Sequence, residues 1–321
     1  MKIVILDGYA SNPGDLSWDK FRALGELTVY DRTPPELVAE RMEDADIVVL
    51  NKVTITEELL DNCHKLKIIA ILATGYNMID LGATARRGIT VCYVPAYSTD
   101  SVAQHTFALL LEVCVRAGDH SASVHSGDWV NANDYCYWKW PLIELSGKTL
   151  GIIGFGNIGQ KVAGIAASFG MKIVYYSRTR YEHLENEAVS YRELDELLAV
   201  SDVISLHCPL TSETEGLINI DAISKMKNGA IIINTTRGAV LDEDAVARAL
   251  NSGKLYAAGL DVLSTEPPSG DNPLLSAKNC IITPHIAWAP KESRARLIDV
   301  THDNIRLYLE GRPQNVVPKL N

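Results

Sequence analysis

The 321-residue sequence contains no C-x-x-C pair, no basic run and no apolar stretch of about 18 residues or more. We therefore expect no membrane-spanning helix and no membrane partner. The six cysteines are scattered, which disfavours a zinc site or a disulfide framework and indicates core residues of a cytoplasmic protein. The net charge of −10 makes nucleic acid an unexpected partner. The histidines lack metal-ligand spacing, so no bound metal is expected.

The length is sufficient for two domains with cores of their own, and 47% of the residues are hydrophobic. The N-terminus reaches an acidic residue, Asp7, too early for a secretory signal, and we interpret residues 2–6 as a first strand.

Residues 1–99 alternate between β-rich runs and helical stretches. The predicted strands are 2–6, 27–30, 47–50, 68–72 and 90–94, and the predicted helices lie near 18–24, 35–42, 56–63 and 79–87. This alternation predicts a parallel sheet with flanking helices. The loop after the fourth strand, Ala73-Thr74-Gly75-Tyr76-Asn77, lies where open α/β sheets bind ligands.

A glycine turn, Gly154-x-Gly156-x-x-Gly159, organises the second half of the chain. A strand-type run at 149–153 precedes it, a helical pattern beginning Asn157-Ile158 follows it, and a second strand is predicted at 172–176. Strand, glycine turn, helix and strand are the beginning of a Rossmann unit, whose helix N-terminus binds a dinucleotide pyrophosphate. An ordinary strand-to-helix turn is the simpler alternative.

The βα alternation continues to the C-terminus, with strands predicted at 202–207, 230–235, 257–262 and 280–283 and a long helix at 291–309. We expect a substrate (catalytic) domain formed by residues 1–99 and 288–321 and a coenzyme domain formed by residues 100–287. A helix is predicted at 102–116.

Residues 119–146 show little periodicity and are crowded with aromatic side chains: Trp129, Tyr135, Tyr137, Trp138 and Trp140. We interpret this segment as an extended arm, whose aromatic residues contact either another subunit or their own chain.

Three chemically distinct residues, Arg237, Glu266 and His285, each follow a predicted strand of the coenzyme domain. Strand ends of a parallel sheet converge on one crevice. There an imidazole can deliver a proton, a carboxylate can orient it, and a guanidinium can bind an α-carboxylate and polarise a ketone. Taken singly, each residue has an ordinary alternative: a capping arginine, a turn carboxylate and a loop histidine.

Four ordered motifs make the chain resemble the D-isomer-specific 2-hydroxyacid dehydrogenases. They are the glycine turn, Asn234-Thr235-Thr236-Arg237-Gly238, Asp261-Val262 leading to Glu266-Pro267, and Thr283-Pro284-His285. The match extends to the segments at residues 72–77, 94–104 and 284–288. Their sequences are most similar to those of glycerate dehydrogenases, also called hydroxypyruvate reductases.

The resemblance implies a Rossmann domain plus a flavodoxin-like parallel α/β substrate domain. It implies that Arg237 binds substrate, that His285 is the acid/base paired with Glu266, and that backbone around Ala73, Thr74 and Gly75 binds the carboxylate. By the same matching, the nicotinamide side of the coenzyme site is lined by Cys208, Pro209, Thr235, Thr236, Asp261 and His285. The arm at 119–146 is then a dimerisation arm of a homodimer.

One position departs from the usual pattern of NAD enzymes. The strand at 172–176 ends in Ser177-Arg178-Thr179-Arg180, where an acid usually binds the adenosine ribose. Ser177 and Arg178 instead favour the 2′-phosphate of NADPH, with NADH as the alternative coenzyme.

We expect an NAD(P)-dependent enzyme that reduces a small unphosphorylated 2-oxo acid, hydroxypyruvate or glyoxylate, to the D-2-hydroxy acid. The alternatives are a dehydrogenase for another acid such as D-lactate, and a dinucleotide-sensing binding protein of the same fold. Glu266 disfavours a formate dehydrogenase, and the cation-free 73–77 loop disfavours a phosphorylated substrate.

Overall fold

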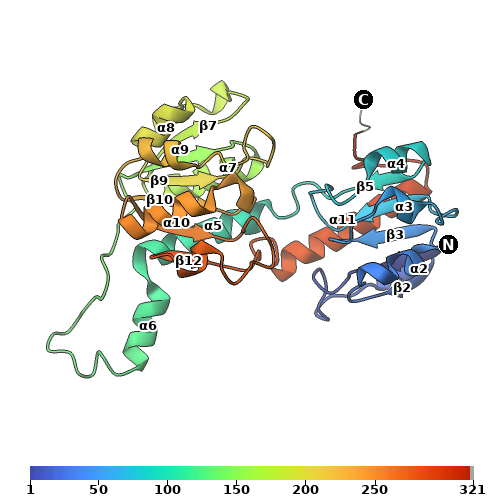
Figure 1. Ribbon diagram of the computed structural model, residues 1–321, viewed down its shortest axis with the longest axis horizontal. Coiled ribbons are helices and arrows are strands. Elements are labelled where there is room, and N and C mark those ends of the chain that lie inside the picture. Colours follow the sequence, from blue (N-terminus) through green and yellow to red (C-terminus); the bar gives the residue numbers. More distant parts are fainter. Residues whose placement is uncertain (319–321) are drawn as a thin grey trace. The chain divides into compact units, whose positions relative to one another are not determined.

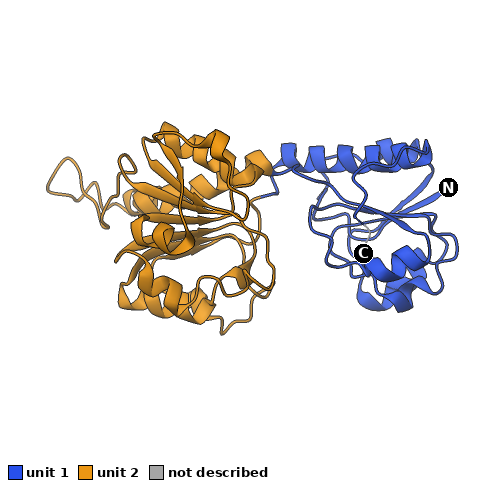
Figure 2. Ribbon diagram, turned by 90° about the horizontal axis from the view of Figure 1, so that it is seen from above, with its two compact units in different colours: residues 1–98, 288–321 blue, residues 99–287 orange. Residues whose placement is uncertain are grey.

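The computed structural model describes residues 1–318 and divides the chain into two compact units, residues 1–98 with 288–321 and residues 99–287 (Figure 2). Each unit is built on one parallel sheet, as the predicted fold class requires. Within residues 1–318, no helix is both long and apolar enough to cross a lipid bilayer.

The first unit contains a five-stranded sheet in the order β2-β1-β3-β4-β5. Its strands are β1 Lys2–Ile5, β2 Glu26–Val29, β3 Ile47–Leu50, β4 Ile68–Ile71 and β5 Thr90–Cys92. The central strands β3 and β4 are buried along their whole length, which explains why they appear as unbroken apolar runs. The order is that of flavodoxin-like folds.

Helices cover both faces of this sheet. They are α1 Asp19–Arg22, α2 Val38–Met42 with the preceding 3₁₀ turn η1 Pro35–Leu37, α3 Glu57–Leu60, α4 Leu81–Arg86 and α11 Lys291–Leu309. Helix α11 returns from the C-terminal part of the chain and packs Leu297, Ile298 and Ile305 against the strands (Figure 2).

The second unit contains a seven-stranded sheet in the order β12-β11-β10-β9-β6-β7-β8. Its strands are β6 Thr149–Ile153, β7 Lys172–Tyr176, β8 Val189–Tyr191, β9 Val203–Leu206, β10 Ala230–Asn234, β11 Leu255–Leu260 and β12 Cys280–Ile282. Counted from β6, this is the 3-2-1-4-5-6 Rossmann order with one further strand. The crevice where β6 and β9 diverge is therefore the expected ligand position.

The helices of the second unit also lie on both sheet faces. They are α5 Thr99–Val115, α6 Ala117–His125, α7 Asn157–Ser168, α8 Leu194–Val200, α9 Ile220–Lys225 and α10 Glu243–Ser252. Short 3₁₀ turns occur at η2 Glu182–Leu184, η3 Gly238–Val240 and η4 Pro273–Ser276. Helix α5 begins three residues before the predicted helix and ends where Arg116 adopts a left-handed conformation, with φ +49°.

The prediction of an extended segment throughout 119–146 is wrong at its start, because α6 is a regular helix. Ser123 is its one buried residue, so the helix has no apolar stripe that could produce a readable period. After α6 the chain does run as a loop, and Figure 1 shows this loop extending away from the seven-stranded sheet. Strand β8 was not predicted, since it is a three-residue edge strand with no fully buried residue.

Candidate active site

The glycine turn joins β6 to α7, and each of its glycines has a separate structural reason. Gly154 has φ +96°, and a Cβ there would lie 2.5 Å from the backbone nitrogen of Cys208. A Cβ on Gly159 would overlap the carbonyl oxygen of Gly154, so the helix can approach the strand only with glycine. Both positions exclude every other residue.

Gly156 differs because a Cβ there would meet no atom within 4 Å. Its position next to open space leaves room for a ligand close to the backbone. Gly156 is also the N-cap of the 12-residue helix α7, and no side chain caps that N-terminus. Uncapped N–H groups beside an open glycine suit a pyrophosphate, so residues 154–159 fit a dinucleotide.

The end of β7 carries the two positions expected to bind the adenosine ribose. Ser177 is half-buried and Arg178 is exposed. Arg180, the second cation of this strand end, forms a bidentate ion pair with Glu185 at 2.7 and 3.1 Å and lies over the ring of Tyr191. Within residues 1–318 a carboxylate pairs with Arg180 but none pairs with Arg178. Arg178 therefore keeps its positive charge available at this strand end.

Strands β9 and β10 lie on the same side of β6, and the loops that follow them carry further residues expected at the coenzyme site. Burial raises the pKa of the Cys208 thiol, so this side chain stays neutral beside the glycine turn. Thr235 is buried, with its hydroxyl 3.2 Å from that of Thr106 on α5. Thr236 donates from its N–H and its hydroxyl to Asn234, and Pro209 accepts a hydrogen bond from Thr214.

The structure brings Glu266 and His285 together although 19 residues separate them. Oε2 of Glu266 lies 2.6 Å from Nδ1 of His285. Oε1 of the same carboxylate accepts a hydrogen bond from the Leu263 N–H, which fixes its orientation. Because Nδ1 faces the carboxylate, Nε2 is the nitrogen left to face a substrate. About a quarter of the His285 side chain is exposed, so the ring remains accessible.

Arg237 is placed beside the same loop. The next residue, Gly238, leaves no space for a Cβ against the backbone of Leu263 and Ser264. The loop after β10 and the loop that carries Glu266 are thus in direct backbone contact. Arg237 is exposed and donates to its neighbour, Thr236 O, at 2.7 Å. Within residues 1–318 it has no carboxylate partner, which leaves the guanidinium available for an acid.

Asp261 holds the loop on which His285 lies. Its carboxylate is 1% exposed and accepts hydrogen bonds from the Thr283 hydroxyl at 2.6 Å and from the N–H groups of Ile286 and Ala287 at 2.9 and 2.8 Å. Burial would raise the pKa of this carboxyl, but these bonds and that from His105 keep it below its usual value. The carboxylate is thus engaged within its own chain.

The sequence analysis gave His105 no role in the site. Its Nε2 lies 2.9 Å from the Thr283 hydroxyl. Since that hydroxyl donates its single proton to Asp261, His105 must donate from Nε2. Next to it, Thr106 contacts Thr235, so two consecutive residues of α5 support two strand ends. No signal in the helical period could have revealed this role.

The loop after β4 belongs to the first unit. Thr74 donates its hydroxyl to the carbonyl oxygen of Val94 at 2.7 Å, and the Val94 N–H donates to Ala73 O at 2.9 Å. These bonds tie the loop to the segment after β5 and leave Thr74 exposed. No cluster of three metal-ligating residues is found in the part of the chain that the structure describes.

Two comparisons decide the family of this chain. Residues 107–287 match the family description "D-isomer specific 2-hydroxyacid dehydrogenase, NAD binding domain". The whole chain is 54% identical over 322 residues to a hydroxypyruvate reductase of Blautia hydrogenotrophica, covering 99% of this chain and 100% of the relative. The chain belongs to the D-isomer-specific 2-hydroxyacid dehydrogenases.

Other known proteins are similar over nearly the whole length. A glycerate dehydrogenase of Methylorubrum extorquens is 37% identical over 319 residues, 98% of each chain. The solved structure of an acyclic imino acid reductase in complex with NADPH and D-Arg superposes with a TM-score of 0.85 at 32% identity, covering 99% of this chain and 100% of that one. The expected family, fold class and enzyme class are confirmed: the chain is an NAD(P)-binding 2-hydroxyacid dehydrogenase.

Proposed function

We propose that this dehydrogenase reduces hydroxypyruvate to D-glycerate and, as a second and smaller substrate, glyoxylate to glycolate. The observation that carries the proposal is the 2.6 Å contact between His285 and Glu266 at the strand ends of the coenzyme sheet. The names of its hydroxypyruvate reductase and glycerate dehydrogenase relatives support the substrate.

The proposed chemistry assigns one task to each side chain. The coenzyme, when bound, supplies the hydride that reduces the carbonyl carbon. His285 gives a proton from Nε2 to the carbonyl oxygen, and the carboxylate of Glu266 stabilises the imidazolium that donates it. Arg237 binds the α-carboxylate and polarises the carbonyl. For Ala73, Thr74 and Gly75, we propose that backbone N–H groups bind the carboxylate of the acid.

The proposed coenzyme site consists of the glycine turn, with Asn157 and Ile158 at the helix start, and of the loops that carry Cys208, Pro209, Thr235 and Thr236. Asp261 is proposed to contribute by holding the 283–287 loop, because its carboxylate is already used within the chain. For the ribose end we propose that NADPH is accepted and preferred, through Ser177 and Arg178.

We further propose that the enzyme is a homodimer whose subunits are joined by the arm at 119–146. Within the chain, Tyr137 contacts the Ser123 hydroxyl and Trp140 packs against His120. In contrast, Tyr135 is 90% exposed and Trp138 is 65% exposed. Large exposed aromatic side chains on one loop favour a protein partner. The six unpaired cysteines support the proposal of a cytoplasmic location, which cell fractionation would test.

A panel of initial rates tests the substrate proposal. Hydroxypyruvate, glyoxylate and pyruvate are each reduced with NADPH and with NADH, and kcat/KM is compared. We expect hydroxypyruvate to give the highest value. A higher value for pyruvate would reassign the chain to the D-lactate type while leaving the family unchanged.

A further inference from the structure

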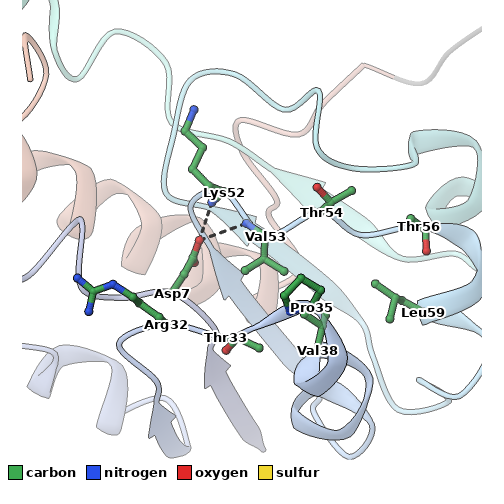
Figure 3. A pocket seen from close by; sticks show the side chains of 10 residues that line it. All are labelled: Asp7, Arg32, Thr33, Pro35, Val38, Lys52, Val53, Thr54, Thr56 and Leu59. Carbon is green, nitrogen blue, oxygen red and sulfur yellow. Dashed lines mark hydrogen bonds between the residues drawn. The ribbon is translucent and has the colours of Figure 1, made fainter. Parts of the chain in front are cut away.

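The first unit contains a pocket of about 510 Å³ that the proposed reaction does not use (Figure 3). Its walls come from the loops after β1, β2 and β3 and from residues of η1, α2 and α3. The ten described residues that line it are Asp7, Arg32, Thr33, Pro35, Val38, Lys52, Val53, Thr54, Thr56 and Leu59. None of them belongs to the 73–75 loop or to the second unit.

The pocket lies where this sheet topology favours a ligand. Strand β1 pairs with β2 on one side and with β3 on the other, so successive strands leave β1 in opposite directions. In open α/β sheets ligands bind outside the carboxyl ends of the strands at such a switch point. Asp7 follows β1 and Lys52 to Thr56 follow β3, so the lining residues stand at the switch point itself. The volume is in the range of small-molecule sites.

Asp7 builds the floor of the pocket. Its carboxylate accepts the N–H groups of Asn51 at 2.7 Å, Lys52 at 2.6 Å and Val53 at 3.2 Å, which holds the loop after β3 in place. Burial raises the pKa of this carboxyl, and the three backbone donors offset part of that effect. Among the ten lining residues Asp7 is the single acid, and Arg32 and Lys52 are the two cations, so their formal charges sum to +1.

The remaining lining places apolar side chains and one arginine on different sides of Asp7. Figure 3 shows Pro35, Val38, Val53 and Leu59 together on one side of Asp7 and Arg32 on the opposite side, while Lys52 extends away from both groups. Arg32 is exposed and stacks at 3.9 Å over the ring of Tyr9. A stacked guanidinium keeps its edge N–H groups for an anion, and no carboxylate pairs with Arg32 within residues 1–318.

Hydroxyl groups complete the lining. Thr56 is at the N-cap position of α3, but its side chain makes no capping hydrogen bond. Thr33 donates to Leu6 O at 2.5 Å and accepts from Arg41 at 2.8 Å, so it is fixed in place. An apolar wall, a cationic side and a hydroxyl that caps nothing match an amphipathic anion better than a neutral apolar molecule.

We propose that this pocket binds a small organic anion, with its apolar part against Val53 and Leu59 and its carboxylate or phosphate toward Arg32. The site lies wholly within the first unit. The assignment is independent of the reaction proposed above, because it rests on lining residues that take no part in that reaction.

Three probes with one phenyl ring test the charge requirement: phenyl phosphate, benzoate and benzyl alcohol. They are titrated into the full-length chain, labelled at the methyl groups of valine, leucine and threonine, without coenzyme or 2-oxo acid. We expect saturable shifts at Val38, Val53 and Leu59 with the two anions and none with benzyl alcohol at equal concentration. The anion with the lower Kd identifies the preferred headgroup.

A matched pair of variants tests the cation. Arg32→Met should raise the Kd of the better anion about tenfold, the effect of losing one charge-assisted bond. Arg32→Lys should have a smaller effect, since it keeps the charge. Arg22→Met removes an exposed arginine of α1 outside the pocket and should leave the Kd unchanged. Thermal unfolding of each variant confirms that it is folded.

Three results would overturn the proposal. If benzyl alcohol binds as tightly as the anions, the pocket binds apolar molecules and does not require a negative charge. Equal Kd values for Arg32→Met and Arg22→Met would remove the cation from the site. Anion-dependent shifts confined to the Thr74 methyl group would move binding to the proposed substrate loop. Each outcome leaves the reduction of hydroxypyruvate to be judged by its own rates.

Discussion

The backbone N–H of His285 donates to the carbonyl oxygen of Asp261 at 2.8 Å, while the Asp261 carboxylate binds residues on both sides of that histidine. The histidine itself has φ +55°, a left-handed conformation that side chains other than glycine rarely adopt. A single buried carboxylate therefore holds the backbone that aims the proposed proton donor.

Replacing Asp261 by Asn tests this relationship. The amide keeps the volume but offers one acceptor oxygen to a set of donors, so at least one buried N–H loses its partner at a cost of about 1–3 kcal/mol. We expect a lower melting temperature and a lower kcat, with a changed pH dependence of kcat. Asp80→Asn, at the N-cap of α4, is the control and should change neither kcat nor its pH dependence. Normal kcat in Asp261→Asn would disprove the positioning role.

His285→Asn should lower kcat for hydroxypyruvate by roughly 10²–10⁴-fold, the usual contribution of a positioned general acid. Asparagine tolerates a left-handed backbone, so the loop should keep its conformation. Glu266→Gln should reduce kcat less, because the imidazole remains. Coenzyme Kd is measured in parallel, and near-normal turnover with intact coenzyme binding would remove His285 from the mechanism.

Coenzyme choice depends on Arg178 in our proposal. Arg178→Met should lower kcat/KM with NADPH by about tenfold or more and change the value with NADH little. Ser177→Asp should have the same direction, since a carboxylate repels a 2′-phosphate. Arg180→Met is the matched control, because Arg180 is already paired with Glu185. If all three variants keep the native ratio of NADPH to NADH use, this strand end does not recognise the 2′-position.

The dimer proposal predicts a sedimentation mass of about twice the 35.2 kDa of the chain. Replacing the exposed Tyr135 and Trp138 by serine should shift the protein toward monomer. Replacing the exposed Leu275, which lies outside the arm, is the control. A native protein that sediments as a monomer at micromolar concentration would assign the arm to contacts within its own chain.

His207 makes stability depend on pH. Burial lowers its pKa to about 3, whereas the unfolded value is about 6.5. Below about pH 6.5 the unfolded chain binds a proton that the folded chain does not, so the free energy of unfolding falls by up to about 1.4 kcal/mol per pH unit. Denaturant unfolding at pH 7 and pH 5 measures the loss.

His207→Gln should reduce that loss, and the exposed His64→Gln should not. The pKa of Asp261 is lowered, so its contribution is lost only at pH values below the unfolded pKa of about 3.9. The interval between pH 7 and pH 5 therefore leaves out Asp261, and the difference between the native protein and His207→Gln measures the contribution of His207. An unchanged loss in His207→Gln would show that its imidazole is solvated.

The parts of the molecule that could be predicted from the sequence are those in which the structure allows only one type of residue. Buried parallel strands such as β4 require unbroken apolar runs, and Gly154 and Gly159 stand where backbone leaves no room for a Cβ. The contact between Glu266 and His285 could be anticipated because both follow neighbouring parallel strands.

Other features could not be predicted because they depend on side chains meeting across the fold. The pairing of Arg180 with Glu185 removes a cation that the sequence alone leaves available. The contact of His105 with Thr283 joins residues 178 positions apart. Helix α6 was not predicted because it buries only one residue. A helix without an apolar face shows no 3.6-residue hydrophobic period in its sequence.

The left-handed backbone at His285 also bears on how this fold can diverge. In this left-handed conformation a histidine costs more free energy than glycine or asparagine would. The folded chain is therefore less stable with His285 than it would be with either of those residues. A substitution that abolishes proton donation can thus leave the protein as long-lived in the cell as before. Selection on folding alone would not preserve this histidine, and a descendant released from turnover could persist as a carrier or sensor of its dinucleotide.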